Sequence, residues 1–203
     1  KTLDISYRSL VWQHNQKENY VILEYTIKNP TATDKTNFRF GIFADWDIST
    51  NGANDSAKWD ALNNMGYVFN SQSSAVPLAG IQLLTGIANY YAIDNNQSLA
   101  GNPLGLYDGY TDEEKFTSLS TQRLAAGLTP SGSDVSQVIS SGPHTISAGG
   151  EIKIAFALHA ANTLTELKNS AVQADLMYNS TLQASIPTGN DVEACYDNPA
   201  TLS

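Results

Sequence analysis

The feature that most constrains this chain is a two-residue alternation of apolar and polar side chains that returns in several short segments. Because successive side chains of a β-strand point to opposite faces of a sheet, this period predicts strands with one buried face. Short polar connections, with no helix of crossover length, separate the first three segments, which favours antiparallel pairing over a parallel α/β sheet. The alternating segments are residues 3–11, 20–28, 38–46 and 152–159.

Shorter apolar runs predict further strands, and the last alternating segment carries small residues on its second face. A strand with that pattern is expected to be central and covered on both sides. The polar stretch 51–58 is predicted to be a connection, and residues 59–64 are predicted to form a helical turn. The additional strands are expected at 66–69, 81–84, 90–93 and 135–139.

Two helices are predicted by a Thr-x-x-Glu pattern, in which the Thr side chain caps the helix and the Glu returns a hydrogen bond. The pattern occurs at Thr111 and again at Thr163. Phe116 and Leu119 are expected to anchor the first, short helix. The buried face of the second helix is expected to consist of Leu164, Leu167, Ala171, Ala174 and Tyr178.

These elements together predict a mainly β fold, a single-domain antiparallel β-sandwich with two short helices. A chain of 203 residues suits one well-cored domain. We expect the sandwich to occupy residues 1–185 and a C-terminal tail or linker to occupy residues 186–203. The chain has no charged and apolar leader at Lys1, so we expect it to be a processed or excised piece of a longer protein.

The charge balance excludes one class of partner. The chain has 11 Lys and Arg residues and 20 Asp and Glu residues, which gives a net charge of −9. Such a chain repels phosphate, so no nucleic acid partner is expected. No apolar run is long enough to span a bilayer, so no membrane span is expected. Cys195 is alone, the three histidines are isolated, and no nucleophile or zinc motif is present in the sequence. No catalytic residue is therefore predicted.

Carboxylates gather after the third alternating segment. Asp45 and Asp47 would project from one face of a strand, about 7 Å apart. Two carboxylates that close favour a bound hard cation such as Ca²⁺, with oxygen ligands from the following loop. The alternative is that they are ordinary strand-end and turn residues that bond to local backbone. The candidate metal ligands are Asp45, Asp47, Asn51, Asn54 and Asp55.

Two other classes of function stay open. A carbohydrate-binding module would present aromatic rings to sugars, and Trp59 and Tyr107 are the aromatic residues in polar segments. Its partner would be a cell-surface or extracellular polysaccharide. A hydrolase would use a pair of carboxylates as acid and base. The candidate pairs are Asp45 with Asp60 and Asp47 with Asp108.

Several sequence segments, taken in their order along the chain, resemble those of a known kind of protein region. They are residues 20–29, 41–47, 64–69, 134–139 and 141–158, followed by the helix at Thr163. This order resembles an accessory region of large secreted bacterial proteins that carry a C-terminal sorting signal. Some of those proteins have a subtilisin-like protease domain upstream. The resemblance spans about residues 3–180 and contains no catalytic signature. It implies a secreted or cell-surface, non-catalytic domain whose partners are the neighbouring domains of the same polypeptide.

Overall fold

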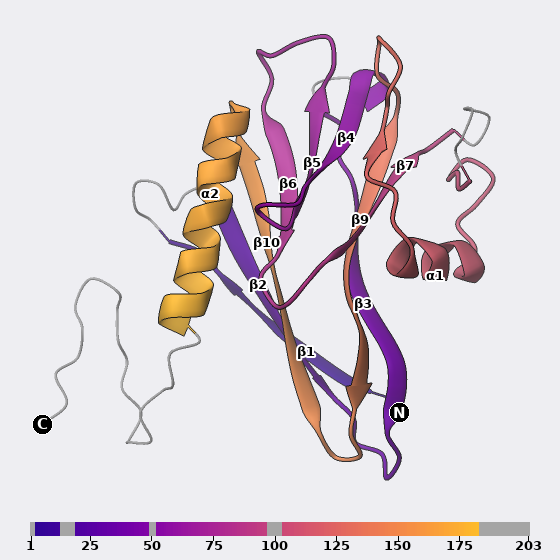
Figure 1. Ribbon diagram of the computed structural model, residues 1–203, viewed down its shortest axis with the longest axis vertical. Helices are drawn as coiled ribbons and strands as arrows, with labels where there is room; N and C mark the ends of the chain where they lie inside the picture. Colours follow the sequence, from indigo (N-terminus) through magenta and orange to yellow (C-terminus); the bar gives the residue numbers. More distant parts are fainter. Residues whose placement is uncertain (1–2, 13–18, 49–51, 97–102, 183–203) are drawn as a thin grey trace, which may run out of the picture.

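Two antiparallel sheets packed face to face form the body of the molecule (Figure 1). The computed structural model describes residues 3–12, 19–48, 52–96 and 103–182. The predicted antiparallel β-sandwich with two helices is confirmed. The predicted tail at 186–203 lies outside the described residues.

The larger sheet has seven strands in the order β1-β2-β10-β6-β5-β4-β8. β10 lies between β2 and β6 and is buried on both faces along its centre. This position was predicted from the small residues on the second face of the segment 152–159. The strands are β1 (Asp4–Leu10), β2 (Tyr20–Lys28), β4 (Asp55–Asp60), β5 (Met65–Asn70), β6 (Leu78–Leu83), β8 (Ala125–Ala126) and β10 (Glu151–Ala161).

The smaller sheet has three strands in the order β3-β9-β7. They are β3 (Lys35–Asp45), β7 (Asn89–Asp94) and β9 (Val135–Ile146). β1 and β2 pair as expected, but β3 crosses to the opposite sheet instead of joining them. The crossing follows Asn29, whose buried side-chain amide donates to the carbonyls of Thr33 and Ile146. These bonds fix the corner at which the chain changes sheet.

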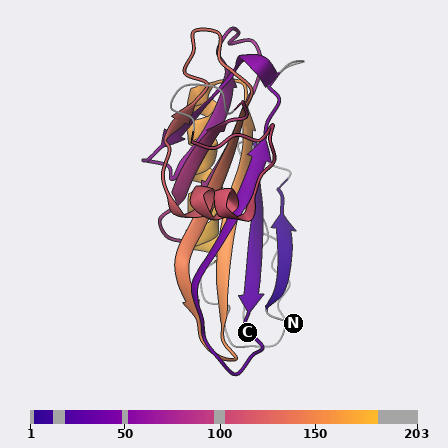
Figure 2. The same ribbon diagram turned by 90° about the vertical axis from the view of Figure 1, so that its right-hand side faces the viewer.

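A helix lies on the outer face of each sheet, so both outer faces are partly covered (Figures 1 and 2). α2 (Leu164–Leu176) packs on β10, β6 and β2 and continues into a π-helical turn, Met177–Leu182. α1 (Asp112–Ser120) packs on β9, β7 and β3. No helix in the described part of the chain combines the length and the apolar character needed to cross a membrane.

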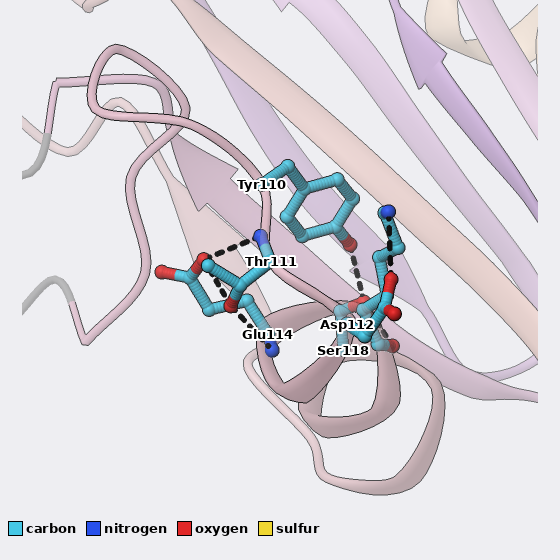
Figure 3. Close-up of polar contacts among 6 residues, drawn as sticks. Tyr110, Thr111, Asp112, Glu114 and Ser118 are labelled. Atoms are coloured by element: carbon cyan, nitrogen blue, oxygen red, sulfur yellow. Dashed lines mark hydrogen bonds and ion pairs between the residues drawn. The ribbon is translucent and has the colours of Figure 1, made fainter.

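Both helices begin with the predicted capping box. In α1 the Thr111 hydroxyl accepts the Glu114 N–H at 3.3 Å, and the Glu114 carboxylate accepts the Thr111 N–H at 2.8 Å (Figure 3). Phe116 does not anchor this helix, because half of its surface is exposed; Ser118 is the buried residue and contacts the Tyr110 hydroxyl (Figure 3).

The predicted buried face of α2 is correct except at its first residue. Leu167, Ala171, Ala174 and Tyr178 are all fully buried, whereas Leu164 is 37% exposed. Leu164 directly follows the N-cap Thr163 and is the first residue of the helix.

In the middle of the chain the strands predicted at 66–69, 81–84 and 90–93 are confirmed as β5, β6 and β7, but the prediction for the segment before them is wrong. Residues 55–60 form β4 and not a polar connection running into a helical turn. β4 is paired along both of its edges, because Asp55 pairs with Asn70 of β5 on one side, while Ser133 and Ala126 of β8 pair with Asp55 and Ala57 on the other. Backbone pairing therefore decides the conformation of this segment against its polar composition.

Candidate functional site

Carboxylates gather at the end of the sandwich where β3 stops and β9 begins, which is the upper end in Figure 1. We call this group the acidic cluster. Burial and the charges of Asp47 and Asp134 raise the pKa of Asp55, and the charges of Asp134 and Asp45 act on Tyr107. The acidic cluster comprises Asp45, Asp47, Asp55, Asn95, Tyr107 and Asp134.

Asn95 joins two of these carboxylates. Its side-chain nitrogen donates to Asp134 Oδ1 at 2.6 Å and to Asp45 Oδ1 at 3.3 Å. Its side-chain oxygen accepts the hydroxyl of Ser136 at 2.7 Å, which orients the amide. Asn95 itself is buried, so the bridge between the two carboxylates is held from inside the fold.

Tyr107 closes the outer side of this group. Its hydroxyl donates to Asp134 Oδ2 at 2.7 Å, and 66% of the residue is exposed. The loop that carries Tyr107 is held to the end of β7, because the Asn95 carbonyl accepts the N–H groups of Leu106 and Tyr107. The hydrogen bond to Asp134, partial burial and the charges of Asp134 and Asp45 raise the pKa of the tyrosine.

The structure thus brings Asp45, predicted to bind metal, and Tyr107, predicted to bind sugar, into one site. The residues that connect them, Asn95 and Asp134, were missed by the sequence analysis. Asp134 directly precedes the predicted strand at 135–139, and Asn95 lies two residues after the predicted strand at 90–93. That position was the only available signal, and it does not say which strand ends meet.

The other predicted metal ligands have structural partners. Asp55 is fully buried, with Oδ2 accepting the Ile48 N–H at 2.8 Å and Oδ1 accepting the Asn70 amide at 3.2 Å. Burial raises the pKa of Asp55 to about 6, although these hydrogen bonds oppose that shift. Asn54 donates from its side chain to the carbonyl of Ser131 at 2.9 Å. Asn51 lies outside the described residues.

Asp47 is exposed, and its carboxylate lies directly over Gly52. A Cβ atom at Gly52 would be 2.1 Å from Asp47 Oδ1, so a larger residue there would displace this carboxylate. Within the described residues, no three His, Cys, Asp or Glu side chains form a group that could hold a metal ion.

Trp59 packs against the core. Its ring stacks on that of Tyr90, with centroids 5.1 Å apart and planes 20° apart. Tyr90 in turn occupies the space above Gly66, where a Cβ atom would be 2.1 Å from the tyrosine ring. Tyr107 is therefore the exposed member of the predicted aromatic pair, and Trp59 is a half-buried packing residue.

The first carboxylate pair considered for a hydrolase, Asp45 with Asp60, is divided between two hydrogen-bond networks. Asp60 bonds to the Asn63 side chain at 2.8 Å and to Lys168 of α2 at 3.2 Å. Asp45 bonds to Asn95 at the end of the other sheet. The carboxylate that the fold does place beside Asp45 is Asp134.

The exposed carboxylate of Asp45 and the half-buried carboxylate of Asp134 share a buried amide next to an exposed tyrosine, and this arrangement offers two kinds of chemistry. Their oxygen atoms are suitable ligands for a hard cation. The same oxygens accept hydrogen bonds from sugar hydroxyls, while the tyrosine ring offers an apolar face.

Comparison with known proteins assigns no family. A scan against protein-family models finds no match for this chain. A search of curated proteins also finds no significant match.

Proposed function

We propose that this chain is a non-catalytic accessory domain of a larger secreted bacterial protein, in which it positions or attaches neighbouring domains. The resemblance over residues 3–180 supports the extracellular setting. The observation that supports the structural role is that buried and half-buried polar side chains hold loops to the sandwich by hydrogen bonds.

Asp94 is the clearest case. It is buried and pairs with Arg123 at 2.6 Å, while its other oxygen accepts the N–H of Gly127 and the hydroxyl of Ser133, each at 2.7 Å. Arg123 also donates to the carbonyl of Ala92 at 2.8 Å. The Asp94 carboxylate therefore joins β7 to the two segments on either side of β8.

Asn64 performs the same task on another loop. Its amide nitrogen donates to the carbonyls of Leu83 and Gly86, and its oxygen accepts the N–H of Ala88. Together with Asn29 at the sheet-to-sheet corner, these residues direct their hydrogen bonds to the backbone of distant segments. Such bonds stabilise a rigid frame, which is what a domain that positions its neighbours requires.

The proposal is tested by joining the chain to the domains encoded on either side of it in its gene. We expect a neighbour to melt at least about 2 °C higher when joined to this domain than when alone. We also expect the isolated chain to turn over neither glycosides nor peptides. Turnover that is abolished by Asp134→Asn would overturn the non-catalytic assignment and favour a hydrolase built on the acidic cluster.

A cation such as Ca²⁺ belongs to the same proposal. Asp45 and Asp134 would supply the charged oxygen ligands, and Tyr107 and Asn95 would hold those carboxylates in place. Its role would be to stabilise the end of the sandwich where three separate segments meet.

Carbohydrate binding is the second candidate, and the exposed ring of Tyr107 beside two carboxylates is the observation that favours it. Binding to extracellular polysaccharides in a pull-down should then be lost in Tyr107→Ala. Phe116→Ala is the matched control, because Phe116 is an exposed aromatic residue on α1 outside the acidic cluster. Equal binding by both variants would exclude Tyr107 as the sugar platform.

A further inference from the structure

The two sheets have four edges, and three of them are protected against pairing with another chain. β8 ends the large sheet with only two residues. β3 is made irregular in its first half by register shifts between Lys35 and Phe38 and between Phe38 and Phe40. The free side of β7 is occupied by Arg123, which exchanges backbone hydrogen bonds with Tyr90 and Ala92. Short edges, irregular edges and covered edges are the usual ways to prevent edge-to-edge association.

The fourth edge, β1, has none of these features. It pairs with β2 without a register shift over all seven residues, from Asp4 to Leu10. No strand among the described residues pairs with its outer side. Ile5 and Tyr7 point to the inner face of the sheet, where their β2 partners are Ile27 and Tyr25, yet they are 53% and 69% exposed.

We propose that β1 is a self-association edge, which pairs antiparallel with β1 of a second copy of this chain around a two-fold axis at Ser6. The pairing joins the two large sheets into one continuous sheet. In this register Ser6 faces the partner's Ser6, Ile5 faces the partner's Tyr7, and Asp4 faces the partner's Arg8.

The inner face of the joined sheet is apolar in this register. A row of neighbouring side chains runs across this face, from Ile27 and Ile5 of one copy to the partner's Tyr7 and the partner's Tyr25. The two-fold axis repeats this row, so two apolar rows cross the junction. Cross-strand pairs of an aromatic and a β-branched side chain are among the favourable pairs in antiparallel sheets.

The outer face carries a row of alternating charges. Lys28 lies opposite Asp4 in the same copy, and Arg8 forms an ion pair with Glu24 at 2.9 Å. Across the junction the order becomes Lys28, Asp4, the partner's Arg8 and the partner's Glu24. Asp4 and the partner's Arg8 then each lie between two charges of opposite sign, which stabilises this register.

Neighbouring registers lose this match. A two-fold axis at Tyr7 would place Asp4 opposite the partner's Leu10 and Arg8 opposite the partner's Ser6. A slip of one residue would turn the apolar side chains of one copy to the charged face of the other. The side-chain pattern of β1 therefore selects a second copy in one register.

Cysteine cross-linking tests the register, using the full chain with Cys195→Ser as background. Ser6→Cys places two thiols directly opposite each other, about 4.5–5.5 Å apart between Cα atoms, within the range that a disulfide spans. Ser9→Cys is the matched control on the same strand, because Ser9 faces the partner's Leu3 and the two Ser9 Cα atoms lie about 20 Å apart. We expect a covalent dimer from Ser6→Cys under mild oxidation and none from Ser9→Cys.

Sedimentation equilibrium of the chain with its natural residues tests association itself. At about 150 mM salt, which screens the repulsion between two copies of net charge −9, we expect dimers that increase with concentration. Tyr7→Lys should give monomers with an unchanged far-UV spectrum, because an inward-pointing charge blocks an edge strand. The proposal is overturned if the chain stays monomeric up to about 1 mM. It is also overturned if Ser9→Cys cross-links as well as Ser6→Cys does.

Discussion

The imidazole of His159 lies buried between the large sheet and α2. Nδ1 is 2.8 Å from the hydroxyl of Ser170, and Nε2 has no hydrogen-bond partner among the described residues. The ring of Tyr20 packs beside it, with centroids 6.0 Å apart. Because this environment disfavours a charge, burial lowers the pKa of His159 from 6.5 to about 3.

This shift makes His159 a source of acid sensitivity. Between pH 6.5 and about 3 the unfolded chain protonates this histidine and the folded chain does not, so the free energy of unfolding decreases as the pH falls. From about pH 7 to about pH 4.5 the loss from this residue is roughly 2 kcal/mol. Urea unfolding at both pH values should show a smaller acid-induced loss for His159→Gln than for the natural chain.

Asp55 provides a control, because its protonation changes the free energy of unfolding in the opposite direction. Its pKa is raised by burial from 3.8 to about 6, so protonation in this window favours the folded state. Asp55→Asn removes that gain. The free energy of unfolding of this variant should therefore decrease more steeply with falling pH than that of the natural chain. If both variants change the pH dependence in the same direction, this assignment of the two groups is wrong.

At the scale of the element, the same capping box serves two helices that differ in what they bury. α2 places Leu167, Ala171 and Ala174 against the large sheet, whereas α1 buries only Ser118. A capping hydrogen bond stabilises the folded protein globally only when the helix it starts unfolds together with the core.

We therefore expect Thr163→Ala to lower the global free energy of unfolding by about 1 kcal/mol. Thr111→Ala should change it less and should instead speed amide hydrogen exchange in the first turn of α1. Thr163→Ser keeps the accepting oxygen and is the matched control in chemical denaturation. Equal global losses for Thr163→Ala and Thr111→Ala would contradict this view of α1.

At the scale of the whole molecule, the acidic cluster joins segments that are far apart in the sequence. Asp45 ends β3, Asn95 follows β7 and Asp134 precedes β9. A cation bound here would stabilise only the folded state, since the unfolded chain does not bring these groups together.

Thermal melting with EDTA and then with excess Ca²⁺ tests that proposal. At about 100 times the dissociation constant the gain is about 2.7 kcal/mol, which raises the melting temperature by roughly 5–10 °C. Asp134→Asn should remove the increase, and Asp112→Asn, which alters an exposed carboxylate on α1, should retain it. A melting temperature that does not respond to Ca²⁺ would remove the cation from the proposed function.

The sequence by itself determined those features of the fold that depend on residues close together along the chain. The alternation in residues 20–28 and 152–159 predicted β2 and β10, and the Thr-x-x-Glu patterns predicted both helix starts, because side-chain direction and capping depend on near neighbours. Only the tertiary structure decided that β3 changes sheet, that residues 55–60 form a strand, and that Asp134 and Asn95 meet Asp45. These results depend on backbone pairing and hydrogen bonds between segments distant in sequence, which no local pattern records.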